Sequence, residues 1–188
     1  MKTARTLAIA LGALAAVATF AAAAPAAAAP FTLDPPVVLT SAGQSADVTI
    51  AAMLFKKLNV PVKSLPAAKA ADLEGAKSLV VVAGFSSKGL GSAGINRDQE
   101  MERVTSVLAA AKEKGLRVLV LHLGGKARRG VQSDDFNTVA AKAAGALVVV
   151  KAGDEDGLFS RIAAERKVPI DLVEKISDAG VPISKMVK

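Results

Sequence analysis

The sequence contains no cysteine, tryptophan or tyrosine, and its single histidine is His122. Without cysteine the chain can form no disulfide and carries no cysteine for lipid attachment at a signal boundary. One histidine and no cysteine also make a structural zinc site a poor expectation, and we predict no metal site. Stability must therefore come from burial of an apolar core, for which the chain is long enough.

Aromatic residues are scarce, and charge is unevenly balanced. Only five phenylalanines follow residue 29, which leaves few rings for stacking on bases or sugars, so we expect no nucleic-acid partner. The formal net charge is +7 and falls to +5 without Lys2 and Arg5. A basic balance is compatible with anionic ligands or surfaces, although it is also common among exported proteins.

The N-terminus has the pattern of a secretory signal peptide. Lys2 and Arg5 precede a short, alanine-rich apolar segment, Leu7–Phe20, and several A-x-A sites follow it. We expect cleavage after Ala28, so residues 1–28 are predicted to be removed and the protein to be periplasmic or secreted. An uncleaved N-terminal anchor is the alternative.

Short apolar runs alternate with helical patterns over the rest of the chain. After an extended leader (29–36), we predict a single α/β domain over residues 37–188. The expected strands are 37–40, 61–65, 78–83, 117–121, 147–150 and 170–173. The expected helices are 48–58, a helix that Asn96 and Gln99 cap and Gly115 ends, 135–144, 157–166 and a last short helix capped by Ser177.

Alternating strands and helices predict a three-layer, doubly wound, mostly parallel sheet of five to six strands, flavodoxin-like or Rossmann-like. In such sheets ligands bind beyond the carboxyl ends of the strands, where the strand order reverses. The long polar and glycine-rich loops of this chain all follow strands, whereas the opposite connections, such as KEKG and AAG, are short. We therefore predict a ligand site from Ser41, Gly43, Gln44, Ser45, Gly89, Gly91, Gly94, His122, Gly124, Gly125, Arg128 and Arg129.

Basic residues are concentrated in the loop after the strand that ends at His122. Arg128 and Arg129, with Lys126, could clamp a carboxylate or phosphate, because a guanidinium pairs bidentately with either group. A solvated basic loop is the alternative. Asp47 argues against a bare phosphate in the first loop unless it is the N-cap of the following helix, which is the role we expect.

The segment GLGSAG (89–94) matches G-x-G-x-x-G, but its surroundings do not match a dinucleotide site. Three residues separate it from the preceding strand, and His122 stands where an acid would bind ribose. We therefore predict no cofactor. The expected role is a lid or a close backbone approach to the ligand, and a solvated glycine-rich loop is the alternative.

Two further chemistries remain open from the residues alone. GQSAD (43–47) lies one residue short of a nucleophile elbow, so Ser45 as nucleophile and His122 as base, with Asp98 or Asp134 as orienter, are weak catalytic candidates. Asp154, Glu155 and Asp156 offer oxygen ligands to a cation, but the spacing fits no EF-hand loop. Helix capping by Asp156 explains that cluster more simply.

Four segments in order after a signal peptide resemble one uncharacterised family of exported bacterial proteins, domain of unknown function 6305. The segments are LTSAGQSAD, SSKGLGSAGI, GGKARRG and DGLF. The resemblance covers about residues 36–187 and implies a small secreted α/β domain. It implies no reaction, cofactor or catalytic residue.

The favoured hypothesis is an exported binding protein for a small anionic metabolite, serving a membrane transporter or sensor. The chain has length for only one lobe of a two-lobed solute-binding protein, which counts against this hypothesis. The alternatives are a hydrolase or transferase acting on an ester or phosphoester, and an interaction module for a membrane protein. The sequence makes no prediction of the oligomeric state.

Overall fold

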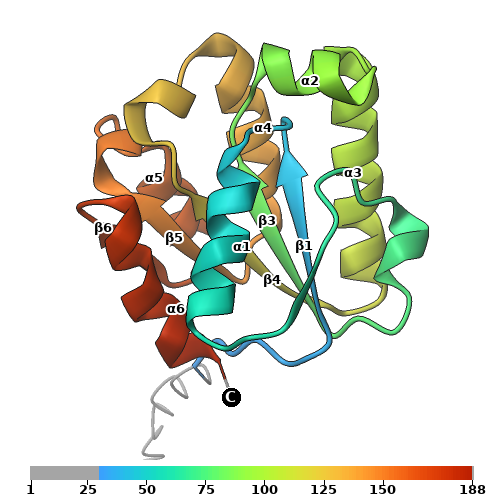
Figure 1. The fold of residues 1–188 in the computed structure, drawn as a ribbon. Coiled ribbons are helices and arrows are strands. Elements are labelled where there is room, and N and C mark those ends of the chain that lie inside the picture. Colours follow the sequence, from blue (N-terminus) through green and yellow to red (C-terminus); the bar gives the residue numbers. More distant parts are fainter. Residues whose placement is uncertain (1–29, 188) are drawn as a thin grey trace, which may run out of the picture.

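The computed structural model describes residues 30–187 (Figure 1). The predicted signal peptide and its cleavage site lie outside the described residues. The leader is held against the end of the chain: Leu33 is buried, and its backbone N–H donates to the carbonyl oxygen of Met186 at 2.6 Å. Leu33 also forms an isolated parallel bridge with Val187, so the two ends of the described chain lie together.

Six strands form one sheet. They are β1 (Val37–Ala42), β2 (Val62–Ser64), β3 (Ser78–Ala83), β4 (Arg117–His122), β5 (Ala146–Val150) and β6 (Ile170–Val173). Their order is β2-β1-β3-β4-β5-β6, and every neighbouring pair is parallel. This is the flavodoxin-like order with one further strand, and it reverses between β1 and β3. The predicted doubly wound α/β class is confirmed.

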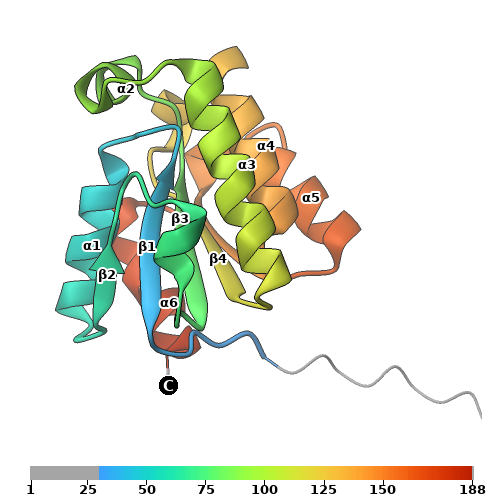
Figure 2. The same cartoon turned by 90° about the vertical axis from the view of Figure 1, so that its right-hand side faces the viewer.

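Helices cover both faces of the sheet and make three layers, with α1 and α6 on one face and α3, α4 and α5 on the other (Figure 2). The α-helices are α1 (Asp47–Lys57), α2 (Ser87–Ala93), α3 (Arg97–Glu113), α4 (Val131–Ala143), α5 (Leu158–Arg166) and α6 (Gly180–Met186). Short 3-10 helices are η1 (Ala70–Leu73), η2 (Gly125–Arg128), η3 (Lys151–Gly153) and η4 (Ile176–Ala179). Within residues 30–187, no helix has the length and apolar character needed to cross a membrane.

The side chains of each central strand divide between two apolar clusters. On β3, Leu79 and Val81 pack with the residues of α3 and α4, while Val80 and Val82 pack with those of α1. All six residues of β3 are buried. Because both faces are covered, the strand sequences are continuous apolar runs rather than alternating ones, as the sequence analysis assumed.

Helix α2 was not predicted, because its sequence SKGLGSA holds two glycines and reads as a loop. The Ser86 hydroxyl caps it by accepting from the backbone N–H of Gly89 at 3.1 Å, and Gly94 ends it in the left-handed conformation. A Cβ on Gly89 would lie 1.9 Å from the carbonyl oxygen of Gln44. The predicted lid is therefore a helix packed on the first loop, and the expected close backbone approach is to protein.

Two helix starts differ from their predictions. Asp47 is the first residue of α1 and not its N-cap, because its carboxylate pairs with Arg128. Ser177 lies inside η4, where its hydroxyl donates to the carboxylate of Asp178, and it caps no helix. The capping box of Asn96 and Gln99 at the start of α3 is confirmed, with both reciprocal hydrogen bonds at 2.9 Å.

Candidate functional site

The predicted loops converge at one edge of the sheet, which we call the carboxyl edge (residues 41–47, 84–89, 122–130 and 151–157). A Cβ on Gly43 would lie 2.6 Å from the carbonyl oxygen of Gly84, and the backbone N–H of Ser86 donates to the carbonyl oxygen of Gly43 at 2.8 Å. The glycines thus let backbone segments touch one another. They close the space between β1 and β3, where the strand order reverses.

Arg128 fills part of this edge. Its aliphatic stem lies against Gly84 and Gly124, where an added Cβ on Gly124 would stand 1.9 Å from the Cγ of Arg128. Its Nε donates to Asp47 Oδ2 and its Nη1 to the carbonyl oxygen of Phe85, both at 3.3 Å. The carboxylate of Asp47 therefore takes the position in which an acidic ligand of Arg128 would be expected.

Arg129 is held more tightly, between two carboxylates. It donates to Asp134 at 2.7 Å and to Asp156 at 2.8 Å, and it also donates to the carbonyl oxygen of Gly153. Hydrogen bonds to Asp156 and Asp134 raise the pKa of Arg129 well above its usual range, and the bond from Arg129 lowers the pKa of Asp156. Only 13 % of the Arg129 side chain is exposed, so the structure uses this guanidinium to join α4 to the loop before α5.

His122 is fully buried beneath the edge. Its Nδ1 lies 3.1 Å from the carbonyl oxygen of Ala83 and its Nε2 3.2 Å from that of Gly125, while its ring packs on Phe159 at 4.7 Å between centroids. A neutral imidazole has one N–H, so it donates to only one of these carbonyls at a time. Burial lowers the pKa of His122 below its usual value, which favours the neutral ring.

The proposed catalytic set is not assembled. The Ser45 hydroxyl oxygen accepts from the backbone N–H of Asp47 at 3.2 Å, and among residues 30–187 no hydrogen bond joins Ser45 to His122. Asp98 is exposed on α3, and Asp134 bonds to Arg129 and Asn137 rather than to His122. A nucleophile must lie within hydrogen-bond reach of its base, and these two side chains are instead buried among other partners.

A buried charge cluster at the end of β1 was missed by the sequence analysis. Glu100, with no exposed surface, accepts from Arg103 at 2.7 Å, from the Nε2 of Gln44 at 3.1 Å and from the backbone N–H of Gly43 at 2.9 Å. Glu100 lies in the first turn of α3. The i,i+3 pair with Arg103 was the available signal, although such pairs are usually solvated. Gln44, a predicted ligand residue, is used here to hold the first loop.

The acidic segment 154–156 serves the start of α5. Asp154 accepts from the backbone N–H of Phe159 at 2.6 Å, and Asp156 accepts from that of Leu158 at 3.1 Å. The N-cap itself is Gly157, so Asp156 lies one residue before the capping position that it was predicted to occupy. In the described part of the chain, no group of three or more His, Cys, Asp or Glu side chains is placed to hold a metal ion.

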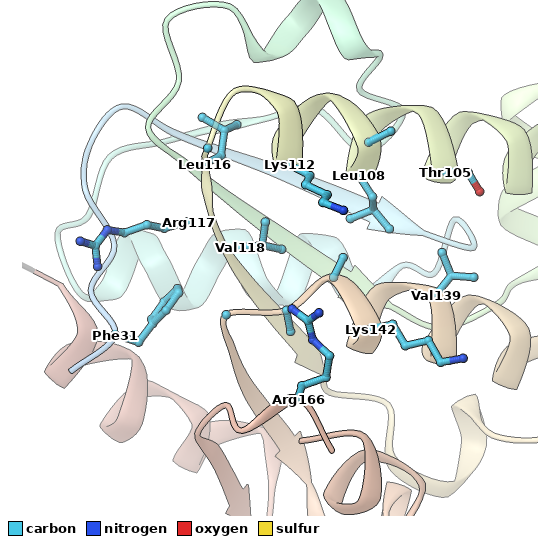
Figure 3. Close-up of a pocket in the computed structure, with 15 residues that line it drawn as sticks. Phe31, Thr105, Leu108, Lys112, Leu116, Arg117, Val118, Val139, Lys142 and Arg166 are labelled. Carbon is cyan, nitrogen blue, oxygen red and sulfur yellow. The ribbon is translucent and has the colours of Figure 1, made fainter. Parts of the chain in front are cut away.

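A groove of about 650 Å³ lies at the other end of the sheet, between α3 and α4 and over the starts of β4 and β5 (Figure 3). We call it the α3–α4 groove. Its apolar lining comes from Phe31, Leu108, Ala109, Leu116, Val118, Val139, Ala143 and Ala144. Its remaining lining residues are Thr105, Lys112, Gly115, Arg117, Lys142, Gly145 and Arg166. Four of the fifteen are basic and none is acidic.

Three of these four basic residues have no acidic partner within residues 30–187. Arg117 pairs with Asp34 at 3.0 Å. Within residues 30–187, no ion pair is formed by Lys112, Lys142 or Arg166, which come from three different helices and are exposed. The groove therefore carries unneutralised positive charge beside an apolar surface, which is the opposite of the carboxyl edge.

Few features of the sequence indicate this groove. Its basic residues are spread over more than fifty positions, and the connections beneath it, KEKG and AAG, are short. Small residues create the space: Ala109 and Ala143 lie on its helices, and Gly145 begins its floor. Alanines on the facing sides of two neighbouring helices were the available signal.

Of the comparisons with other proteins, only the match to a family model assigns this chain to a known group. No curated protein matches the sequence. Solved structures that resemble the fold include an assigned acylhydrolase of Bacteroides fragilis NCTC 9343 (10 % identity, 74 % of this chain and 69 % of that one, TM-score 0.35). Two others are a GDSL-like lipase of Bacteroides thetaiotaomicron VPI-5482 (13 %, 71 % and 65 %, TM-score 0.32) and AlinE4, an SGNH-hydrolase family esterase (10 %, 80 % and 80 %, TM-score 0.31).

Likenesses this weak transfer neither an activity nor a residue role to this chain. The family comparison is different, because it covers nearly all of the described residues. The match runs from residue 34 to residue 187, as the four resembling segments led us to expect. The chain belongs to the family described as domain of unknown function (DUF6305).

Proposed function

We propose that the protein is an exported binding protein for a small anionic ligand, which it holds in the α3–α4 groove. The observation that carries this proposal is the charge of the lining, with four basic residues, no acidic one, and three of the four without an ion pair. Export rests on the predicted signal peptide. The ligand class agrees with the hypothesis drawn from the sequence, but the proposed site lies at the opposite end of the sheet.

The groove has the size and surface of a ligand site. Its volume of about 650 Å³ falls within the range of small-molecule pockets, which combine apolar walls with a few polar groups. Arg166 is suited to a carboxylate or phosphate, since its planar guanidinium can donate two parallel hydrogen bonds, while Lys112 and Lys142 supply point charges. Each exposed charge contact contributes about 0.2–1 kcal/mol, so together they are worth up to roughly a hundredfold in affinity.

The carboxyl edge is a weaker candidate for the same ligand. Arg128 already pairs with Asp47, and Arg129 already pairs with two carboxylates, so an anion at this edge would compete with both. Such a ligand would have to replace charge-assisted hydrogen bonds that already exist. Binding at the carboxyl edge stays a prediction. Because no hydrogen bond joins Ser45 to His122 within residues 30–187, we make no second proposal of hydrolysis.

The test uses 8-anilinonaphthalene-1-sulfonate, a fluorescent anion with an apolar body. We expect the exported protein to bind it, and the triple variant Lys112→Gln, Lys142→Gln, Arg166→Gln to bind it at least tenfold more weakly. The matched control is Lys56→Gln, Lys175→Gln, Lys185→Gln, which removes the same charge from α1, α6 and the start of η4. An equal loss in both triple variants would assign the binding to net charge and overturn the proposal.

A further inference from the structure

We infer that the ligand of the α3–α4 groove is a monomeric single-chain amphiphile, with an acidic head group on an unbranched hydrocarbon chain; this inference rests on the proposed function. A compact polyanion would need only the basic residues. The groove also presents an apolar surface that such an anion would leave in contact with water. The apolar lining, and the position of the unpaired basic residues away from the Phe31 end, indicate a ligand with a hydrocarbon chain.

Apolar side chains from both helices and from the sheet line the groove. Leu108 on α3, Val118 at the start of β4 and Val139 on α4 line the space between the two helices (Figure 3). Ala109 and Ala143 keep the helices from filling it. Each methylene that a ligand buried here would gain free energy from leaving water, which a small hydrophilic anion could not do.

Phe31 closes one end of the groove. A Cβ on Gly145 would lie 2.9 Å from the Phe31 ring, so the ring rests directly on the Gly145 backbone. In Figure 3, Phe31 lies at one end of the lining residues, and Lys142 and Thr105 lie toward the other. The end beside Phe31 has one basic residue, Arg117, and its charge is already paired with Asp34.

The basic residues without ion pairs occupy the rest of the groove. Lys112 and Arg166 flank its middle from opposite sides, and Lys142 lies beyond them (Figure 3). The lining residues of α3 run from Thr105 to Lys112, a distance on the order of 10 Å at the rise of an α-helix. A head group at Lys112, Lys142 and Arg166 would therefore place an extended chain over Val118 toward Phe31.

The experiment is calorimetric titration of the exported protein with butanoate, octanoate and dodecanoate, and with dodecyl phosphate, all below their micelle concentrations. Inorganic phosphate and citrate are the anions without a chain. We expect the affinity to rise roughly three- to fourfold for each added methylene that the groove can cover. Both head groups should bind, because the guanidinium can donate paired hydrogen bonds to a carboxylate and to a phosphate.

A steric variant tests whether dodecanoate lies in the groove. Ala109 is exposed and lines the groove, so Ala109→Trp should fill the space without disturbing the core. We expect it to weaken dodecanoate binding at least tenfold. Ala164→Trp is the matched control, since Ala164 is also an exposed alanine inside a helix but does not line the groove.

The outcomes separate this inference from the proposed function. Equal affinity for citrate and dodecanoate, lost in the Lys112, Lys142 and Arg166 variant, would keep anion binding and overturn the amphiphile. No binding of any anion would overturn both. Binding to vesicles of anionic lipid without binding to monomeric dodecanoate would overturn the inference in favour of a membrane surface.

Discussion

The carboxyl edge and the α3–α4 groove lie at opposite ends of the same parallel sheet and use charge in opposite ways. At the carboxyl edge, Arg128 and Arg129 pair with carboxylates of the chain itself. In the groove, Lys112, Lys142 and Arg166 lack such partners in the described part of the chain and surround an open space. Basic residues that are adjacent in the sequence, such as Arg128 and Arg129, thus belong to a structural network of ion pairs. Basic residues that are far apart in the sequence form the more accessible positive surface.

The largest expected effect on stability comes from a substitution at Glu100, whose carboxylate holds the first loop of the carboxyl edge. Replacement by Gln would leave Arg103, only 12 % exposed, without a charged partner and would weaken the hold on the first loop. Removing one member of a buried ion pair typically costs about 3–5 kcal/mol. We expect Glu100→Gln to lower the free energy of unfolding by that amount in urea denaturation.

Glu102→Gln is the matched control for this change, because Glu102 is exposed on the same helix and forms no ion pair within residues 30–187. Its effect should stay within about 0.5 kcal/mol. Equal stabilities of the two variants would show that the carboxyl edge does not depend on its buried charges.

The second prediction applies one substitution to both regions. Arg129→Gln leaves Asp134 and Asp156 without their guanidinium and should destabilise the protein by about 1–3 kcal/mol. Arg166→Gln removes an exposed guanidinium with no ion pair in the described chain and should change stability by less than about 0.5 kcal/mol. Thermal unfolding of both variants measures the difference, and a larger loss for Arg166→Gln would contradict the contrast.

The smallest expected effect is the response of the carboxyl edge to acid. Because burial lowers the pKa of His122 in the folded protein, the unfolded chain binds more protons below the ordinary value of 6.5. Stability should therefore fall as the pH drops below 6.5, by at most about 1.4 kcal/mol per pH unit from this one group.

Denaturation at pH 7.5 and 5.5 measures this loss, and the pH range avoids titration of Asp134 and Asp156, whose pKa values are lowered. His122→Gln should show a smaller difference between the two pH values. A difference of the same size in this variant would assign the acid response to other groups.

Much of the fold followed from local patterns. The buried strands β3, β4 and β5 were predicted because covered parallel strands are short apolar runs, and the start of α3 because Asn96 and Gln99 form a capping box. Helix α2 escaped prediction because its two glycines lower the local helix propensity, while the close approach of Gly89 to Gln44 is a tertiary contact that local propensity does not contain. The ion pair between Asp47 and Arg128 was not predicted either, because the two residues are far apart in the sequence.

The convergence of the polar loops was also foreseen, because strand ends of a parallel sheet share one edge. What filled that edge was not foreseen. Whether an arginine faces a ligand or an aspartate depends on the distance between loops, and spacing along the chain does not give that distance. The groove was missed because space between helices arises from small residues such as Ala109 and Ala143, each unremarked in its own segment.

The contact between Leu33 and Val187 has a consequence for the order in which the molecule is completed. It joins nearly opposite ends of the chain, and such a contact carries a high loop-closure entropy and is expected to form late in folding. Phe31, two positions before Leu33, contributes the end wall of the groove. We therefore expect the carboxyl edge to form before the groove acquires its final shape at Phe31.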